Sequence, residues 1–169
     1  MVKEKCKKRV DHSSIPPFIN KDSNTLILGS LPSVASRKYG FFYAHPQNRF
    51  FKILAMVFKE EEPKTIDERK AFLTRNNIAL YDVIFACDIY GSSDATIENV
   101  EPIYLKDLLK QYPNIKKVFT TGKKAKELYD KYLLPQTGVE AISLPSSSAA
   151  NASMSLERLV EEYRIILEC

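Results

Sequence analysis

The sequence predicts a three-layer α/β protein in which helices cover both faces of a four-stranded parallel sheet. Short apolar runs alternate along the chain with segments whose apolar residues recur at helical spacing, and this alternation is typical of parallel sheets. Neither a repeat nor a linker divides the 169 residues, so we expect one domain at 24–169 behind a polar lead-in at 1–23. Hydrophobic residues make up 44% of the chain, which is enough to bury a core.

Each expected element has its own local pattern. The strands are short apolar runs, at 24–30, 78–87, 117–121 and 140–144. Helices are expected at 48–58, 65–76 and 105–112, and two more begin at Gly122 and Ser155. Thr65 and Glu68 form a capping box for the second of these helices, and Ser155 is a favourable cap for the last.

Composition narrows the class of protein. The formal net charge of +4 is only mildly basic and does not by itself indicate nucleic-acid binding. Three cysteines, Cys6, Cys87 and Cys169, are odd in number and far apart, which argues against a disulfide framework and against a zinc or iron–sulfur site. We therefore expect no metal, no cofactor and a cytoplasmic location. The charged N-terminus lacks the apolar stretch of a secretory signal, and no apolar run is long enough to span a membrane.

The unusual residues concentrate in the segments that follow the strands, at 29–47, 86–101, 121–123 and 145–153. Loops after parallel strands meet at one edge of the sheet, where open α/β sheets bind their ligands. The first of these loops holds adjacent aromatic side chains, amides and a guanidinium. Such groups suit a flat, hydrogen-bonding ligand, for example a nucleobase on its backbone.

Several residues of the first loop allow two interpretations. Asn48 is either a helix N-cap or an amide that fixes a water or reads a base edge. Phe41, Phe42 and Tyr43 are either core residues or an aromatic shelf, and their place in a loop favours the shelf. Base–aromatic stacking of this kind is worth roughly 1–3 kcal/mol per base. His45 is either a turn histidine or a proton-transfer group.

The serine-rich loops do not indicate a serine hydrolase. The Gly-x-Ser-x-Gly elbow is absent, and no histidine follows His45 to complete the hydrolase order. Serines after strands instead present hydroxyl and N–H groups to phosphates. Lys123 and Lys124 follow Gly122 at a strand-to-helix junction, where they either hold a phosphate or form a solvated helix start.

Three segments together resemble the uracil-DNA glycosylase superfamily. They are Gly29–Ser33, Gly40–Phe50 and Leu144–Ala152. Together these segments are similar to the two signature motifs of that family. The resemblance covers residues 12–167 and is closest to the hypoxanthine (deoxyinosine) branch, followed by the mismatch-specific branch. It implies a four-stranded parallel sheet of order 2-1-3-4, which agrees with the strand count obtained independently.

The resemblance also implies roles for individual residues. Leu31 stands where the mismatch-specific branch has an Asn that positions the attacking water. The resemblance to the hypoxanthine branch implies that Asn48 positions this water instead. Tyr43 stands where the family stacks an aromatic ring on the flipped base. Asp82 stands where some branches read the base edge with an Asn, although a structural aspartate is the alternative. Residues 145–151 match the loop that wedges into the duplex, with Ala149 in place of a common Pro.

We therefore predict a monofunctional DNA glycosylase, acting as a monomer on DNA with a deaminated base: hypoxanthine, with xanthine or uracil as alternatives. No Lys is placed to form a Schiff base. A mismatch-specific uracil/thymine-DNA glycosylase and a non-catalytic nucleic-acid-binding module remain alternatives. The predicted site comprises catalytic Asn48 and His45; a base pocket of Gly29, Ser30, Leu31, Pro32, Tyr43 and Asp82; and DNA contacts from Ser33, Arg49, Gly122, Lys123, Lys124, Pro145, Ser146, Ser147, Ser148 and Asn151.

Overall fold

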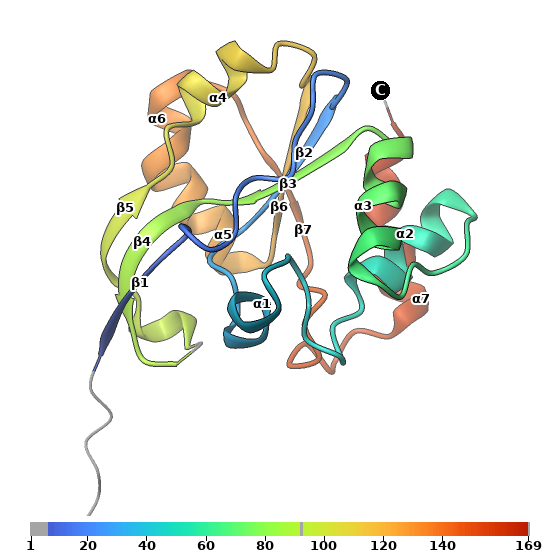
Figure 1. Cartoon of the computed structure of the whole chain (residues 1–169), viewed down its shortest axis with the longest axis horizontal. Coiled ribbons are helices and arrows are strands. Elements are labelled where there is room, and N and C mark those ends of the chain that lie inside the picture. Colours follow the sequence, from blue (N-terminus) through green and yellow to red (C-terminus); the bar gives the residue numbers. More distant parts are fainter. Residues whose placement is uncertain (1–6, 92, 169) are drawn as a thin grey trace, which may run out of the picture.

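The computed structural model describes residues 7–91 and 93–168. Its centre is a parallel sheet of four strands in the order β3-β2-β6-β7 (Figure 1). This arrangement confirms the predicted sheet and its 2-1-3-4 order. The strands are β2 (Thr25–Gly29), β3 (Ile78–Asp82), β6 (Lys117–Thr121) and β7 (Ile142–Leu144).

Helices cover both faces of this sheet, as predicted. One face carries α2 (Phe50–Phe58), α3 (Ile66–Arg75) and α7 (Leu156–Tyr163), and the other carries α4 (Leu105–Gln111), α5 (Lys123–Leu128) and α6 (Leu134–Thr137) (Figure 1). A π-helical turn at Tyr129–Leu133 joins α5 to α6, and a 3-10 turn at Arg164–Leu167 follows α7. In the described part of the chain, no helix is long and apolar enough to cross a membrane.

The predicted caps are confirmed. The Thr65 side chain accepts a hydrogen bond from the Glu68 N–H, and the Glu68 carboxylate accepts one from the Lys64 N–H. Ser155 accepts from the Arg158 N–H at the start of α7. These caps fix where α3 and α7 begin, because they satisfy N–H groups that the first helical turn leaves free.

A second sheet was not predicted. It is antiparallel, with the order β1-β4-β5, and consists of β1 (Lys8–Asp11), β4 (Ile84–Ile89) and β5 (Glu98–Pro102). The single strand predicted at 78–87 is therefore wrong, since the chain leaves the parallel sheet after Asp82. Asp82 is the one polar residue between the apolar runs of the two strands and is itself buried, so the switch between sheets leaves little break in the hydrophobic pattern.

The polar loop predicted at 86–101 is also wrong. It contains the end of β4, a 3-10 turn at Asp94–Thr96 and most of β5. Charged residues face one another across these strands: Arg9 approaches Asp88 at 3.5 Å and Glu101 at 3.6 Å. Cross-strand pairing of this kind allows a polar sequence to form a sheet with one solvated face.

The lead-in predicted at 1–23 is, from residue 8 on, part of the same folded unit. Strand β1 pairs with β4, and Phe18 forms an antiparallel bridge to Leu80 of β3. His12 and Ile15 between them are 2% and 1% exposed. Because only a few isolated residues of this segment are buried, its polar composition concealed the contact.

The loop predicted after β2 holds a short helix, α1 (Val34–Tyr39). Ser33 caps its start, and Gly40 ends it in the left-handed conformation with φ 74°. Phe41 and Phe42 are each only 3% exposed, so they belong to the core and the predicted aromatic shelf is reduced to Tyr43. Tyr43 itself has φ 52°, which is unusual for a bulky side chain and indicates that its surroundings hold it in place.

Candidate active site

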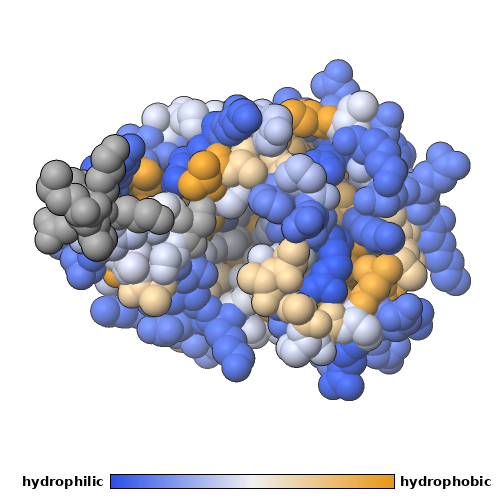
Figure 2. Space-filling view, turned by 90° about the horizontal axis from the view of Figure 1, so that it is seen from below, coloured by the Kyte–Doolittle hydropathy of each residue, from blue (hydrophilic) through white to orange (hydrophobic). Residues whose placement is uncertain are grey.

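A cavity of about 700 Å³ opens at the carboxyl ends of the parallel strands. Figure 2 views this edge of the sheet, whose surface is mostly hydrophilic with separate apolar spots. The cavity is lined by segments 29–36, 121–125 and 146–150, together with Phe42, Tyr43, His45, Gln47, Asn48, Asp82, Ile89 and Asp94. The convergence of the predicted loops is thereby confirmed, although Arg49, Pro145 and Asn151 are not among the lining residues.

Tyr43 is a rigid aromatic wall of the cavity. Its ring stacks on the fully buried Phe50, with 3.7 Å between centroids and an interplanar angle of 11°. A 2.9 Å hydrogen bond joins the Tyr43 hydroxyl to Oγ1 of Thr121 at the end of β6. Burial raises the pKa of Tyr43 well above its usual value, so the phenol stays neutral. Since Phe50 covers one ring face, the opposite face is the one available to a planar ligand.

Asn48 bonds the start of a helix through its side-chain oxygen and keeps its amide NH₂ group for a ligand. Its Oδ1 accepts hydrogen bonds at 2.9 Å from the Phe50 N–H, at the start of α2, and from the Ser147 hydroxyl. The N-cap position itself is held by Arg49, which makes no side-chain cap. Among the described residues, none accepts a hydrogen bond from Nδ2 of Asn48, so the amide NH₂ group is available to a ligand.

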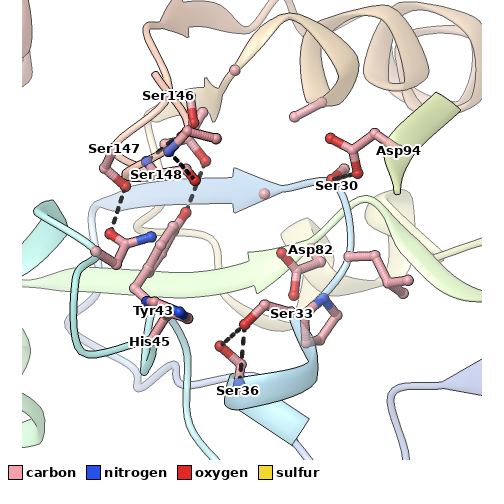
Figure 3. A pocket seen from close by; sticks show the side chains of 18 of the residues that line it. Ser30, Ser33, Ser36, Tyr43, His45, Asp82, Asp94, Ser146, Ser147 and Ser148 are labelled. Atoms are coloured by element: carbon pink, nitrogen blue, oxygen red, sulfur yellow. Dashed lines mark hydrogen bonds between the residues drawn. The ribbon is translucent and has the colours of Figure 1, made fainter. Parts of the chain in front are cut away.

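Ser147 is turned into the protein and not toward DNA. It is 2% exposed, and its hydroxyl donates to Asn48 (Figure 3). Tyr163 of α7 lies beneath it and donates to the Pro145 carbonyl at 2.6 Å. Burial raises the pKa of Tyr163, while a hydrogen bond with Ser147 acts in the opposite direction. This burial argues against the predicted contact between Ser147 and the duplex.

Arg49 also differs from its predicted role as a DNA contact. Its guanidinium donates to the carbonyls of Met154 at 2.7 Å, Asn151 at 3.0 Å and Ser148 at 3.3 Å. The Asn151 amide in turn donates to the Ser146 carbonyl at 2.9 Å. Arg49, Pro145 and Asn151 thus shape the 145–154 loop from within. The exposed residues of this loop are Ala149, Ala150, Ala152 and Ser153, and the first two lie at the cavity.

The segment after β2 forms another wall. A Cβ at Gly29 would collide with Oδ1 of Asp82, so a larger residue here would displace this carboxylate. Ser30 reaches Asp94, with 3.4 Å between Oγ and Oδ1, and burial raises the pKa of Asp94. Ser33 uses its hydroxyl to cap α1, and Leu31 packs against the core, although both line the cavity.

The basic residues and His45 lie toward the outside. Gly122 begins α5 with φ 88° and lies against Ser146. Lys123 is exposed, whereas Lys124 approaches Glu127 at 3.8 Å. His45 is exposed too, and its Nδ1 accepts from the Gln47 N–H at 3.1 Å, which leaves Nε2 for a ligand.

His12 was not among the predicted site residues. Its Nε2 lies 2.7 Å from Oδ2 of Asp82, and its Nδ1 lies 2.7 Å from the Ile15 carbonyl oxygen. A lone histidine in a polar segment carries no pattern that points to a cavity 70 residues further along the chain. Asp94 was missed as well, although it lies in the segment 86–101 that was expected at this edge of the sheet.

Comparison with known proteins completes this description. Residues 16–167 match the model of the uracil DNA glycosylase superfamily. This chain belongs to that superfamily. It is therefore a hydrolase of the DNA glycosylase class, as predicted.

Individual relatives agree with the family assignment. A protein named hypoxanthine DNA glycosylase from Methanosarcina barkeri is 36% identical over 137 residues, which is 80% of this chain and 85% of the relative. A protein of the same name from Methanosarcina acetivorans is 34% identical over 144 residues, 85% and 90% of the two chains. A solution NMR structure provisionally described as a uracil DNA glycosylase from M. acetivorans superposes with a TM-score of 0.76 at 30% identity, covering 91% of this chain and 97% of that one.

Proposed function

We propose that this glycosylase releases hypoxanthine from DNA by hydrolysis and does not cleave the strand. The observation that carries the proposal is the meeting of Tyr43, Asn48 and Asp82 around one cavity at the sheet edge. These residues supply an aromatic face, an amide donor and a carboxylate acceptor, which suits a planar base with both kinds of hydrogen-bonding group. The two relatives named hypoxanthine DNA glycosylase support this choice of base.

The base must leave the stack before it can enter the cavity. Extrusion costs a few kcal/mol, and less for a mispaired or damaged base. The loop held by Arg49 would enter the minor groove at its exposed residues Ala149 and Ala150 and fill part of the gap. Lys123 and Lys124 at the cavity rim would contact phosphates.

The chemistry then takes place against Tyr43. The bond between C1′ and N9 breaks through an oxocarbenium-like state, and its electron pair leaves with the base. The oxygen of a water held by the Asn48 NH₂ group bonds to C1′, and the proton that this water loses ends on the base. Among the described residues, no acceptor is bonded to the N–H groups of Leu31 and Ser33, which can therefore stabilise the departing base. Donors of this kind are worth roughly 10²–10³ in rate each.

A base-release assay tests the proposal. Single-turnover reactions on duplexes that contain inosine, xanthine or uracil should give the fastest base release from inosine. The protein should be a monomer in solution under these conditions. The product strand should break only after alkali, because a monofunctional enzyme leaves an intact abasic strand. Asn114→Ala is the matched control, since Asn114 bonds the Lys21 carbonyl before β6, at the opposite edge of the sheet.

The alternatives predict other outcomes of the same assay. Faster release of uracil or thymine opposite guanine would favour a mismatch-specific enzyme. Binding of all duplexes without any base release would favour a non-catalytic module. Either result would overturn the proposal.

A further inference from the structure

A buried ion pair lies at the floor of the cavity. It joins His12, from the segment after β1, to Asp82 at the end of β3. The side chains are 0% and 6% exposed, and 2.7 Å separates Nε2 from Oδ2. Figure 3 shows Asp82 among the cavity residues, on the side away from Ser146–Ser148. The rings of Phe42 and Tyr81 pack against the imidazole.

The geometry fixes the protonation of this pair. Both ring nitrogens of His12 face oxygen atoms, one of Asp82 and one of the Ile15 carbonyl. A neutral imidazole has a single N–H, so only the imidazolium can donate to both oxygens. Burial lowers the pKa of His12, but the hydrogen bond and charge of Asp82 outweigh it, so that the pKa lies above its usual value. The carboxylate opposite it is therefore an acceptor only.

The second carboxylate oxygen faces the cavity. Oδ1 of Asp82 lies against Gly29, and a Cβ built there would also be 3.6 Å from the Tyr43 hydroxyl. Nothing in residues 7–91 and 93–168 hydrogen-bonds to this oxygen. The other titratable groups around the pair are Asp11, beside His12, and the phenols of Tyr43 and Tyr81, whose pKa values burial and the charge of Asp82 both raise.

We propose, on the basis of the glycosylase function above, that His12 holds Asp82 as a fixed ionised acceptor that selects bases with a protonated ring nitrogen. Hypoxanthine has a proton on N1, whereas adenine presents a lone pair there and is repelled by the carboxylate lone pairs. Xanthine and uracil also have a ring N–H beside a carbonyl. The pair thus distinguishes hypoxanthine from adenine and uracil from cytosine, whereas guanine, like xanthine, has a proton on N1 and is not rejected by this acceptor. His12 is a positioning residue, because it acts through Asp82.

Asp82→Asn tests the acceptor. The Nε2–H of the His12 imidazolium would hold the new amide oxygen, so the amide NH₂ would face the cavity and reverse its polarity. Single-turnover release of hypoxanthine should fall by about 10- to 100-fold, as for loss of a hydrogen bond to a charged group. Release of unsubstituted purine, whose N1 has a lone pair, should not fall. An equal loss on both bases, in a variant with an unchanged unfolding midpoint, would overturn the proposal.

His12→Phe tests the positioning by its pH profile. Without the imidazolium, burial favours the neutral acid of Asp82, whose O–H is a donor. Hypoxanthine release by this variant should be slow near pH 6 and rise with pH as Asp82 ionises, whereas the wild-type rate should not show this rise. His12→Gln keeps a neutral donor to Asp82 and should be intermediate, and it serves if His12→Phe does not fold. A uniform loss of rate with an unchanged pH profile would mean that the pair is only structural.

The same experiments separate this inference from the proposed function. If the wild-type protein releases no base from any duplex, both fail together. If it releases hypoxanthine and the variants at His12 and Asp82 keep its selectivity and pH profile, the inference alone fails.

Discussion

Replacement of Arg49 by Met would show whether this residue holds the 145–154 loop in place or contacts DNA. Met keeps most of the side-chain volume but removes the guanidinium that donates to the Ser148, Asn151 and Met154 carbonyls. A hydrogen bond with a charged donor contributes about 1.5–3 kcal/mol. The freed carbonyls lie in a partly exposed loop and can turn to water, so we expect a net loss of about 2–4 kcal/mol of unfolding free energy.

Two assays measure the consequences of this change. Denaturant unfolding gives the loss of stability, provided that the slope with denaturant is unchanged. Single-turnover release of hypoxanthine from paired, mispaired and single-stranded DNA gives the effect on extrusion. A loosened loop should slow release most on the paired duplex, where the base is hardest to extrude, and least on the single strand.

Salt dependence supplies the result that would refute this reasoning. If Arg49 is internal, Arg49→Met leaves the slope of log K against log salt unchanged. The slope should flatten by about one phosphate contact in Lys123→Ala, the control, since Lys123 is exposed at the rim. A flatter slope in Arg49→Met, with stability within 1 kcal/mol of wild type, would show a direct phosphate contact instead.

Four further predictions can be checked with the same methods. Asn48→Ala should slow base release far more than it weakens DNA binding, with about 1 kcal/mol less stability from the lost bond to the start of α2; near-normal single-turnover rates would exclude Asn48 from the reaction. Leu31→Asn should raise release of uracil, because an amide at this cavity position can hold a water; an unchanged uracil rate in a folded variant would count against it. The loss of unfolding free energy in His12→Gln should be greatest below about pH 6.5 and shrink as pH rises, because the raised pKa of His12 makes its contribution disappear on deprotonation; a loss independent of pH would contradict the charged pair. Ala149→Pro should stabilise the protein by about 0.4–1 kcal/mol and preserve release from paired DNA, since the Asn151 N–H bonds the Ser148 carbonyl in a turn whose second position is Ala149; calorimetry showing destabilisation would refute this geometry.

The parallel sheet could be predicted because β2 and β3 are buried along their whole length and β6 at its centre, so that they stand out as apolar runs. The sheet of β1, β4 and β5 could not, because its strands are partly solvated and their polar residues resemble loops. The passage from β3 to β4 is apolar except for Asp82, and a single polar residue does not mark a boundary. The order of apolar and polar residues along the chain does not indicate to which of the two sheets an apolar residue belongs.

The types of residue in the site could be predicted from the sequence, but the orientations of their side chains could not. The loops after parallel strands must meet, so the place of Tyr43, Asn48 and Ser146 followed from the strand order. Whether a side chain turns outward or inward depends on neighbours distant in sequence. Arg49 turns inward because free carbonyls of the 148–154 loop lie within its reach, and Ser147 does so because Asn48 offers an acceptor.

The two interpretations of Asn48 are compatible, and the structure explains why. Its oxygen is occupied by the Phe50 N–H and the Ser147 hydroxyl, so the amide plane is fixed before any ligand binds. An amide fixed through its oxygen can only offer its NH₂ group, and a preoriented donor needs no reorganisation at the moment of reaction. Asp82 follows the same logic with opposite polarity, because His12 occupies one oxygen and leaves the other as an acceptor. The site thus obtains one donor and one acceptor of fixed orientation from contacts that also stabilise the fold. Since His12 precedes β2, the proposed acceptor is oriented by a residue outside the central sheet, from the segment between β1 and β2.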